Sequence, residues 1–126
     1  MKIMITGIAG FIGMHTALRL NELGHEVFGF DNLNNYYEPL LKKERVACLR
    51  EAGVGFRVGD LRDKLDLTDY VSKTKPDMVI HLAAMAGVRY SMSNAGEYID
   101  TNCHGTLNLI NACEASDIQN VIYAST

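Results

Sequence analysis

The sequence lacks the features that would direct it to a membrane or to nucleic acid. No apolar run approaches the ~18 residues that a membrane-spanning helix needs, and glycines interrupt the apolar N-terminal segment too early for a secretory signal peptide. The 12 Lys and Arg against 15 Asp and Glu give a net charge of −3. Such a balance provides no basic surface for nucleic acid or anionic lipid. We therefore expect a cytoplasmic protein with no nucleic-acid partner and no membrane partner.

Cysteine is also scarce, and its spacing is not that of a metal or redox site. Cys48, Cys103 and Cys113 are odd in number and widely separated, with no CxxC pair, which predicts three reduced thiols. The four histidines are scattered as well, so we expect no metal site. His81 follows an apolar run and is expected to be a packed core histidine rather than a ligand.

What the sequence does have is a glycine-rich turn at its start. The apolar run Ile3–Ile5 predicts a buried strand, and glycines follow at positions 7, 10 and 13, where a helical pattern begins. Gly7 allows a sharp exit from the strand, Gly10 lets backbone N–H groups approach a pyrophosphate, and Gly13 lets the helix lie close. The helix N-terminus would favour the phosphates. The two apolar residues between the last two glycines are expected to anchor the turn in the core. A merely tight strand-to-helix turn is the alternative.

An acidic residue follows at the distance that a dinucleotide site requires. Residues 25–30 predict a second strand, and Asp31 comes directly after it, about 20 residues past the glycine turn, where it can accept both hydroxyls of an adenosine ribose. No Arg or Lys lies between Asp31 and Tyr37 to receive a 2′-phosphate, which favours NAD over NADP. The alternative for Asp31 is a loop cap.

Strand and helix patterns alternate along the chain, without repeats or linkers, as expected of one α/β domain. Further strands are predicted over 55–60, 77–84 and 120–126, and helices over 39–52, 65–74 and 97–115. Right-handed crossovers then require a doubly wound parallel sheet, with strand order 3-2-1-4-5. The glycine turn, Asp31, Asp60, Ala83 and Thr126 all fall at the carboxyl ends of these strands. We expect a cofactor to cross there, and a close backbone contact at Gly105 of the last helix.

Three segments carry a resemblance to a known family. Thr6–Gly13 (TGIAGFIG) resembles the TGxxGFIG signature of extended short-chain dehydrogenases/reductases, the NAD-dependent epimerase/dehydratase family. Asp31–Tyr37 (DNLNNYY) and Ala86–Ser91 (AGVRYS) are similar, more narrowly, to the UDP-glucuronate 4-epimerases within it. The resemblance covers residues 1–126. It implies an incomplete NAD-binding Rossmann domain, from which the later strands and the substrate domain of such an isomerase are absent.

The resemblance also implies which residues form the NAD site. The implied cofactor-binding residues are Gly7, Gly10, Phe11, Ile12, Gly13, Asp31, Asn32, Asn34, Asn35, Asp60, Leu61, Leu82, Ala83, Ala84, Ala86 and Asn102. Asp60 is implied to contact the adenine, although an N-terminal helix cap would explain it equally well. Asn102 could equally be an exposed helix side chain. Arg89 could meet an anionic group of the substrate, and a solvated loop arginine is the alternative.

For catalysis, the resemblance implies Thr126 as the hydroxyl that hydrogen-bonds the sugar 4-oxygen beside a Tyr-x-x-x-Lys pair. That pair is missing, because no tyrosine of the chain has a lysine four residues on. The whole enzyme would pass a hydride from a UDP-sugar to NAD through a 4-keto sugar, as a homodimer. We expect this chain to bind NAD without catalysing the reaction. The alternatives are a nucleotide-sugar 4,6-dehydratase and a non-catalytic NAD-binding module.

Overall fold

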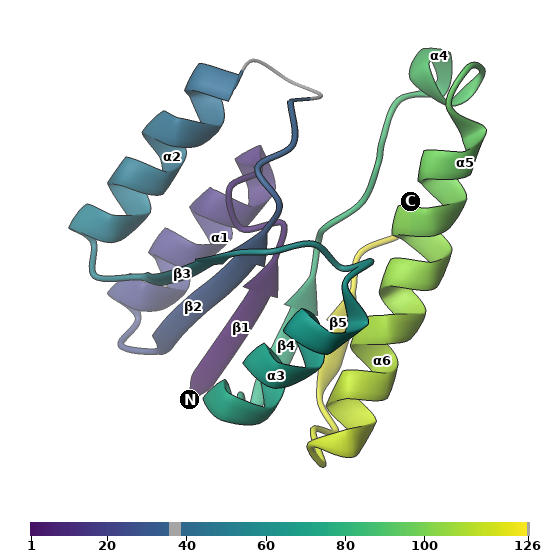
Figure 1. The fold of residues 1–126 in the computed structure, drawn as a ribbon. Helices are drawn as coiled ribbons and strands as arrows, with labels where there is room; N and C mark the ends of the chain where they lie inside the picture. The colour runs from purple at the N-terminus through teal and green to yellow at the C-terminus, as the bar shows by residue number, and fades with distance from the viewer. Residues whose placement is uncertain (36–38, 126) are drawn as a thin grey trace.

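The structure, a computed structural model, describes residues 1–35 and 39–125 and contains a parallel sheet between two layers of helices (Figure 1). The sheet order is β3-β2-β1-β4-β5, which confirms the predicted doubly wound topology. The strands are β1 (Lys2–Thr6), β2 (Glu26–Asp31), β3 (Gly55–Val58), β4 (Met78–His81) and β5 (Val121–Tyr123). The helices are α1 (Phe11–Glu22), α2 (Pro39–Glu51), α3 (Lys64–Thr74), α4 (Val88–Ser91), α5 (Ala95–Tyr98), a π-helix η1 (Ile99–Gly105) and α6 (Thr106–Ala115).

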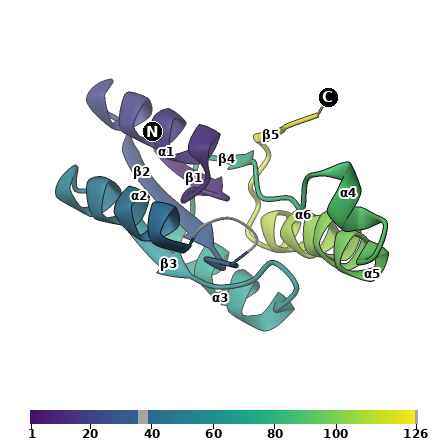
Figure 2. The same ribbon diagram turned by 90° about the horizontal axis from the view of Figure 1, so that it is seen from above.

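Alternate residues of the strands face the two helical layers, because successive side chains of a strand point to opposite faces. Ile3 and Ile5 of β1 pack with α1 and α2, whereas Met4 packs with α3 and α6. Figure 2 shows the two pairs of helices on opposite sides of the sheet. Both faces of β1 are thus buried, as expected of a central parallel strand.

The register of the sheet brings the carboxyl ends of the central strands to one edge. Thr6, the last residue of β1, pairs with Phe30 of β2 on one side and with His81 of β4 on the other. The chain then leaves β2 toward α2 and leaves β4 toward α4, so the connections diverge on either side of β1. A crevice at such a point is where open α/β sheets bind ligands.

Three predicted strands are shorter in the structure than in the sequence-based prediction. β3 ends at Val58, not residue 60. β4 ends at His81, not residue 84, because its neighbour β1 turns away at Gly7. The N–H of Leu82 still donates to the carbonyl of Thr6, but the N–H of Ala83 donates to the Thr6 side chain instead. β5 spans Val121–Tyr123 within the described residues, shorter than the predicted 120–126.

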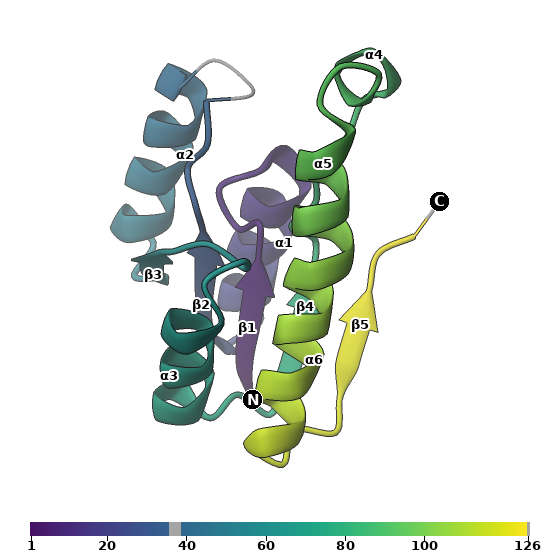
Figure 3. The ribbon, with the colours of Figure 1, turned by 45° about the vertical axis from the view of Figure 1, so that its right-hand side comes forward.

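The long helix predicted over 97–115 is one continuous helical column that changes its type. Figure 3 shows α5, η1 and α6 following one another without a break. A π-helical segment widens the turn at Ile99–Gly105, a feature often found near functional sites. The close contact predicted at Gly105 exists, although its partner is a side chain, because an added Cβ would lie 2.8 Å from Cβ of Leu61. The short helix α4 was not predicted, because its residues have no helical apolar pattern.

His81 is packed in the core, as predicted. Its Nδ1 lies 2.6 Å from Oγ1 of Thr6 and its Nε2 lies 2.9 Å from Oγ1 of Thr106. Burial lowers the pKa of His81 to about 4. The neutral imidazole therefore joins β1, β4 and α6 through two hydroxyls that can each donate or accept.

Two kinds of feature are absent from the described ranges. No helix found there is both long and apolar enough to cross a membrane. Those same residues contain no group of three or more His, Cys, Asp or Glu that could hold a metal ion.

Candidate cofactor site

The glycine turn between β1 and α1 is closed by its own backbone. Gly7 has φ +71°, and an added Cβ would lie 2.8 Å from the backbone nitrogen of Ala83. The N–H of Gly10 donates to the Gly7 carbonyl over 3.0 Å. At Gly13, an added Cβ would come within 2.2 Å of that same carbonyl oxygen. Side chains at Gly7 and Gly13 would therefore force the loop open, and α1 begins directly against the end of β1.

A cleft of about 510 Å³ opens beside this turn, at the carboxyl ends of the strands. Most of the predicted cofactor-binding residues line it: Gly7, Gly10, Phe11, Ile12, Gly13, Asp31, Asn32, Asn34, Asp60, Leu61, Leu82, Ala83 and Ala84. Asn35, Ala86 and Asn102 are not among the lining residues. Sequence reasoning missed other lining residues, which are Phe30, Leu41, Lys42, Arg45, Gly59, Met85, Thr101 and Ala124.

Phe11 and Ile12 do not anchor the turn in the core, so that prediction was wrong. They are 66% and 65% exposed, and both line the cleft. The turn is anchored instead by Ile8 and Ala9, which are fully buried. The physical reason is position, since the first turn of α1 projects beyond the end of the sheet and its apolar side chains face the cleft.

Asp31 caps the loop that follows it, the alternative that the sequence left open, and it also lines the cleft. Its side chain is 6% exposed and lines the cleft, and it also fixes the surrounding backbone. Oδ2 accepts a hydrogen bond from the N–H of Ala9 over 3.1 Å, and Oδ1 accepts one from the N–H of Leu33 over 2.8 Å. The carboxylate therefore ties the glycine turn to the loop after β2 and caps that loop.

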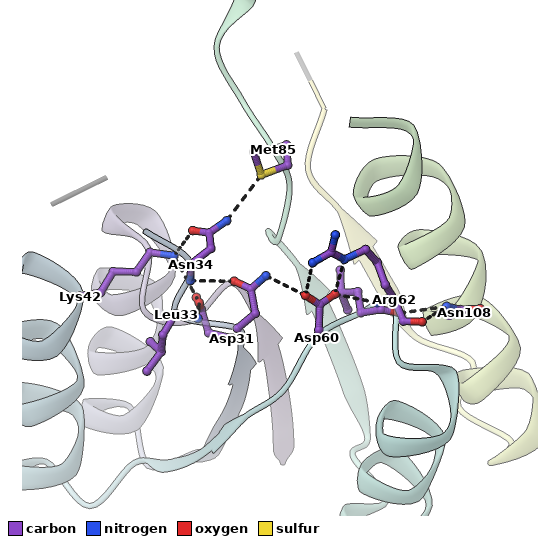
Figure 4. Close-up of polar contacts among 10 residues, drawn as sticks. Asp31, Leu33, Asn34, Lys42, Asp60, Arg62, Met85 and Asn108 are labelled. Atoms are coloured by element: carbon purple, nitrogen blue, oxygen red, sulfur yellow. Dashed lines mark hydrogen bonds and ion pairs between the residues drawn. The ribbon is translucent and has the colours of Figure 1, made fainter. Parts of the chain in front are cut away.

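A buried cation lies next to this carboxylate, although no Arg or Lys lies between Asp31 and Tyr37 in the sequence. Nζ of Lys42, from α2, lies 3.4 Å from Oδ1 of Asp31 and donates to Oδ1 of Asn34 over 2.9 Å (Figure 4). Lys42 is 8% exposed. The sequence-based prediction missed it because only the segment up to Tyr37 was considered, whereas the first turn of the helix after the loop brings Lys42 back.

Asp60 follows β3 and forms an ion pair with a second cation, Arg62. Arg62 donates to it through Nε over 2.9 Å to Oδ1 and through Nη2 over 2.7 Å to Oδ2. Nδ2 of Asn32 donates to Oδ2 over 3.0 Å. The hydrogen bonds from Arg62 lower the pKa of Asp60 to about 2. Asp60 does not cap α3, because Asp63 does so by accepting from the N–H of Asp66.

Comparison with known proteins decides the family. Residues 3–126 match the NAD dependent epimerase/dehydratase family. The chain belongs to this family. Its similarity to "Protein CapI" of Staphylococcus aureus is 43% identity over 126 residues, covering 100% of this chain and 38% of that protein. Its similarity to "UDP-glucuronate 4-epimerase 3" of Arabidopsis thaliana is 39% identity, covering 99% of this chain and 29% of that protein.

A solved member of the family has the same fold. The crystal structure of the UDP-glucose 4-epimerase of Thermus thermophilus in complex with NAD superimposes with a TM-score of 0.86 and 35% identity. The match covers 100% of this chain and 38% of that one. The chain thus spans well under half the length of these relatives.

Asn102 is not an exposed helix side chain, and it does not line the cleft itself. It is half-buried in η1, and its amide forms a pair of hydrogen bonds with the backbone of Met85. Oδ1 accepts from the Met85 N–H over 2.8 Å, and Nδ2 donates to the Met85 carbonyl over 2.9 Å. Asn102 is therefore a positioning residue, which fixes the loop after β4 that forms one wall of the cleft.

The remaining predicted residues lie away from the cleft or outside the described ranges. Arg89 is exposed on α4 and does not line the cleft, which fits a solvated arginine. Asn35 and Ala86 are exposed as well. Thr126, the implied catalytic hydroxyl, and Tyr36 and Tyr37 lie outside the described residues.

Proposed function

We propose that this chain binds NAD in the cleft and forms the cofactor-binding part of a nucleotide-sugar 4-epimerase that prefers UDP-glucuronate. The observation that carries the proposal is the hydrogen bond between Ala9 N–H and Asp31 Oδ2, because it joins a glycine turn to a ribose-type carboxylate in one cleft. The same carboxylate lines the cleft beside the turn, where the hydroxyls of a ribose could reach it.

The residues present fit a dinucleotide. Gly10 borders the cleft with no side chain, and the N-terminus of α1 begins beside it, so a pyrophosphate has both room and unpaired N–H groups. Asp31 supplies a carboxylate for ribose hydroxyls. Leu61 and the small residues Ala83 and Ala84 also line the cleft and would leave apolar space for a flat ring. NAD when bound would supply hydride acceptance from C4 of the sugar and hydride return.

The chain's own groups would bind and orient NAD. The α1 N-terminus would hold the pyrophosphate, Asp31 would accept the ribose hydroxyls, and Asn102 would hold the wall formed by Met85. Thr126 would hydrogen-bond the sugar 4-oxygen, since a hydroxyl can position and donate but has too high a pKa to act as the base alone. Proton abstraction requires the Tyr-x-x-x-Lys pair, which these 126 residues do not contain.

Two observations favour UDP-glucuronate among the nucleotide sugars. The segments DNLNNYY and AGVRYS resemble the corresponding parts of UDP-glucuronate 4-epimerases, and relatives bearing that name are among the matches. A non-catalytic NAD-binding module is the second candidate, because the cleft accounts for cofactor binding alone. A 4,6-dehydratase would share the cofactor site and differ only in the later chemistry.

Cofactor binding and product analysis together test the proposal. Calorimetric titration of the chain with NAD should give saturable binding at one site, and no heat of binding would contradict the cofactor assignment. The longest natural polypeptide containing this chain is then incubated with NAD and UDP-glucuronate, and in parallel with UDP-glucose. Conversion of UDP-glucuronate to its 4-epimer supports the proposal. Loss of water from the sugar indicates a dehydratase, and NAD binding without any conversion indicates the non-catalytic module.

A further inference from the structure

The ribose end of the cleft contains a cation that an NAD site does not require. Lys42 lies one turn into α2 and is 8% exposed, and its ammonium contacts Asp31 and Asn34, which both line the cleft. A buried ammonium is costly unless it is paired. Here the pairing carboxylate is the same group that is proposed to receive the ribose hydroxyls.

We infer that Lys42 is a specificity-determining residue for the cofactor. Its ammonium is paired with the Asp31 carboxylate, and it becomes a 2′-phosphate-binding cation once the carboxylate charge is removed. This inference rests on the proposed NAD site and deepens it. It assigns the choice between a 2′-hydroxyl and a 2′-phosphate to a pair of residues, not to Asp31 alone.

The Asp31 carboxylate already has several partners within the chain. Its Oδ2 accepts from Ala9, and its Oδ1 accepts from Leu33 and lies beside Lys42. The charge of Asp31 is therefore partly neutralised. A 2′-phosphate placed there would meet a carboxylate of like sign and an ammonium of opposite sign within the same few ångströms. Lys42 thus weakens the rejection of NADP that Asp31 provides.

A second cation of α2 serves as an internal comparison. Arg45 lies three residues on and also lines the cleft, but it points toward the glycine turn. Its Nη1 lies 3.4 Å from the carbonyl oxygen of Ala9, and its guanidinium lies 6.0 Å from the centre of the Phe11 ring. Arg45 therefore borders the pyrophosphate region that NAD and NADP share, whereas Lys42 borders the region where they differ.

The test compares the affinities of NAD and NADP across a double-mutant cycle. The proteins are the wild type, Asp31→Ser, Lys42→Met and the double variant, with circular dichroism to verify folding and calorimetry to measure both cofactors at one salt concentration. Asp31→Ser should shift the NADP-to-NAD affinity ratio toward NADP by about tenfold or more, because a charge-assisted hydrogen bond replaces a repulsion. Lys42→Met should shift the ratio toward NAD, and the double variant should lose the gain of Asp31→Ser.

Controls separate the possible failures. Asp31→Asn keeps the shape of the side chain and should show the same direction if Asp31→Ser folds poorly. Arg45→Met should weaken both cofactors equally and leave their ratio unchanged. If the gain for NADP persists when Lys42 is replaced, the inference is overturned while the NAD site stands. If the wild type binds no NAD, it is the proposed function that fails.

Discussion

Oδ2 of Asp31 lies 3.1 Å from the backbone nitrogen of Ala9, so the acidic end of β2 is hydrogen-bonded to the middle of the glycine turn. This contact spans 22 residues of sequence and makes the two halves of the proposed dinucleotide site one unit. A change at Asp31 should therefore alter both the ligand contact and the shape of the turn.

Replacing Asp31 with Ala should weaken NAD binding by about 1–3 kcal/mol, the cost of losing a hydrogen bond to a charged group. The variant should also lose some thermal stability, because Lys42 would keep its buried ammonium without the carboxylate. Calorimetry and thermal unfolding measure the two effects. Glu22→Ala is the control, since its exposed ion pair with Arg19 lies at the far end of α1. Equal NAD affinities for wild type and Asp31→Ala would rule out the ribose role.

The pair of hydrogen bonds between Asn102 and Met85, called the clamp below, should contribute to both stability and NAD affinity. Asn102→Ala removes two hydrogen bonds and leaves backbone groups of Met85 unpaired, so unfolding free energy should fall by about 1–3 kcal/mol. Asn102→Asp can still accept from the Met85 N–H but cannot donate to its carbonyl. Its NAD affinity should therefore lie below that of the wild type. Asn120→Ala is the matched control, because it removes a side-chain hydrogen bond to the Asp77 carbonyl, and neither residue lines the cleft. A loss of NAD affinity in Asn120→Ala as large as in Asn102→Ala would contradict the positioning role.

Gly105 should be intolerant of a side chain even though it lies in a helix. Alanine favours helix by about 1 kcal/mol over glycine, but its Cβ would lie 2.8 Å from Cβ of Leu61, and overpacking costs about 1–3 kcal/mol. Gly105→Ala should therefore lower stability in chemical denaturation. Gly96→Ala in α5 is the control, because nothing lies within 4 Å of its added Cβ. Leu61→Gly is the change that removes the contacting Cβ, so combining it with Gly105→Ala should cost less than the sum of the two single changes. A stabilised Gly105→Ala variant would disprove the close contact.

The buried His81 predicts that stability falls as the pH is lowered from 6.5 toward 4. Its pKa is about 4 in the folded chain and near 6.5 when unfolded, so over that window only the unfolded chain takes up the proton. The loss is at most about 3 kcal/mol from this group and is absent above pH 6.5. Denaturation curves at several pH values measure it. His81→Gln should flatten the dependence between pH 6.5 and 5, and an unchanged slope would exclude His81 as the cause.

Much of the fold followed from local patterns, because short-range physics determines them. The alternation of strand and helix patterns, together with the right-handed crossover rule, predicted the sheet order. The glycine spacing also predicted that the turn after the first strand would border the cleft. Asp31 was predictable because it directly follows the predicted second strand, about 20 residues past the glycine turn.

The parts that were missed depend on contacts between distant segments. Lys42 reaches Asp31 only because α2 folds back across the loop, and nothing in the sequence between them specifies that angle. Phe11 and Ile12 are apolar residues that face a cleft, which composition alone cannot distinguish from a core. The end of β4 depends on where β1 turns away, and the π-helix accompanies the clamp at Asn102 and the packing of Gly105 on Leu61.

The measurement that tests the account most directly is calorimetric titration with NAD of the wild type and of Gly10→Val. Gly10 has φ −71° and ψ 168°, which any residue adopts, and an added Cβ meets only the Gly7 carbonyl, at 3.0 Å. The fold should therefore persist by circular dichroism. The branched side chain would occupy the space proposed for the pyrophosphate, so affinity should fall about 10–100-fold. Full NAD affinity in a folded Gly10→Val protein would show that the glycine turn is structural only and would contradict the proposed site.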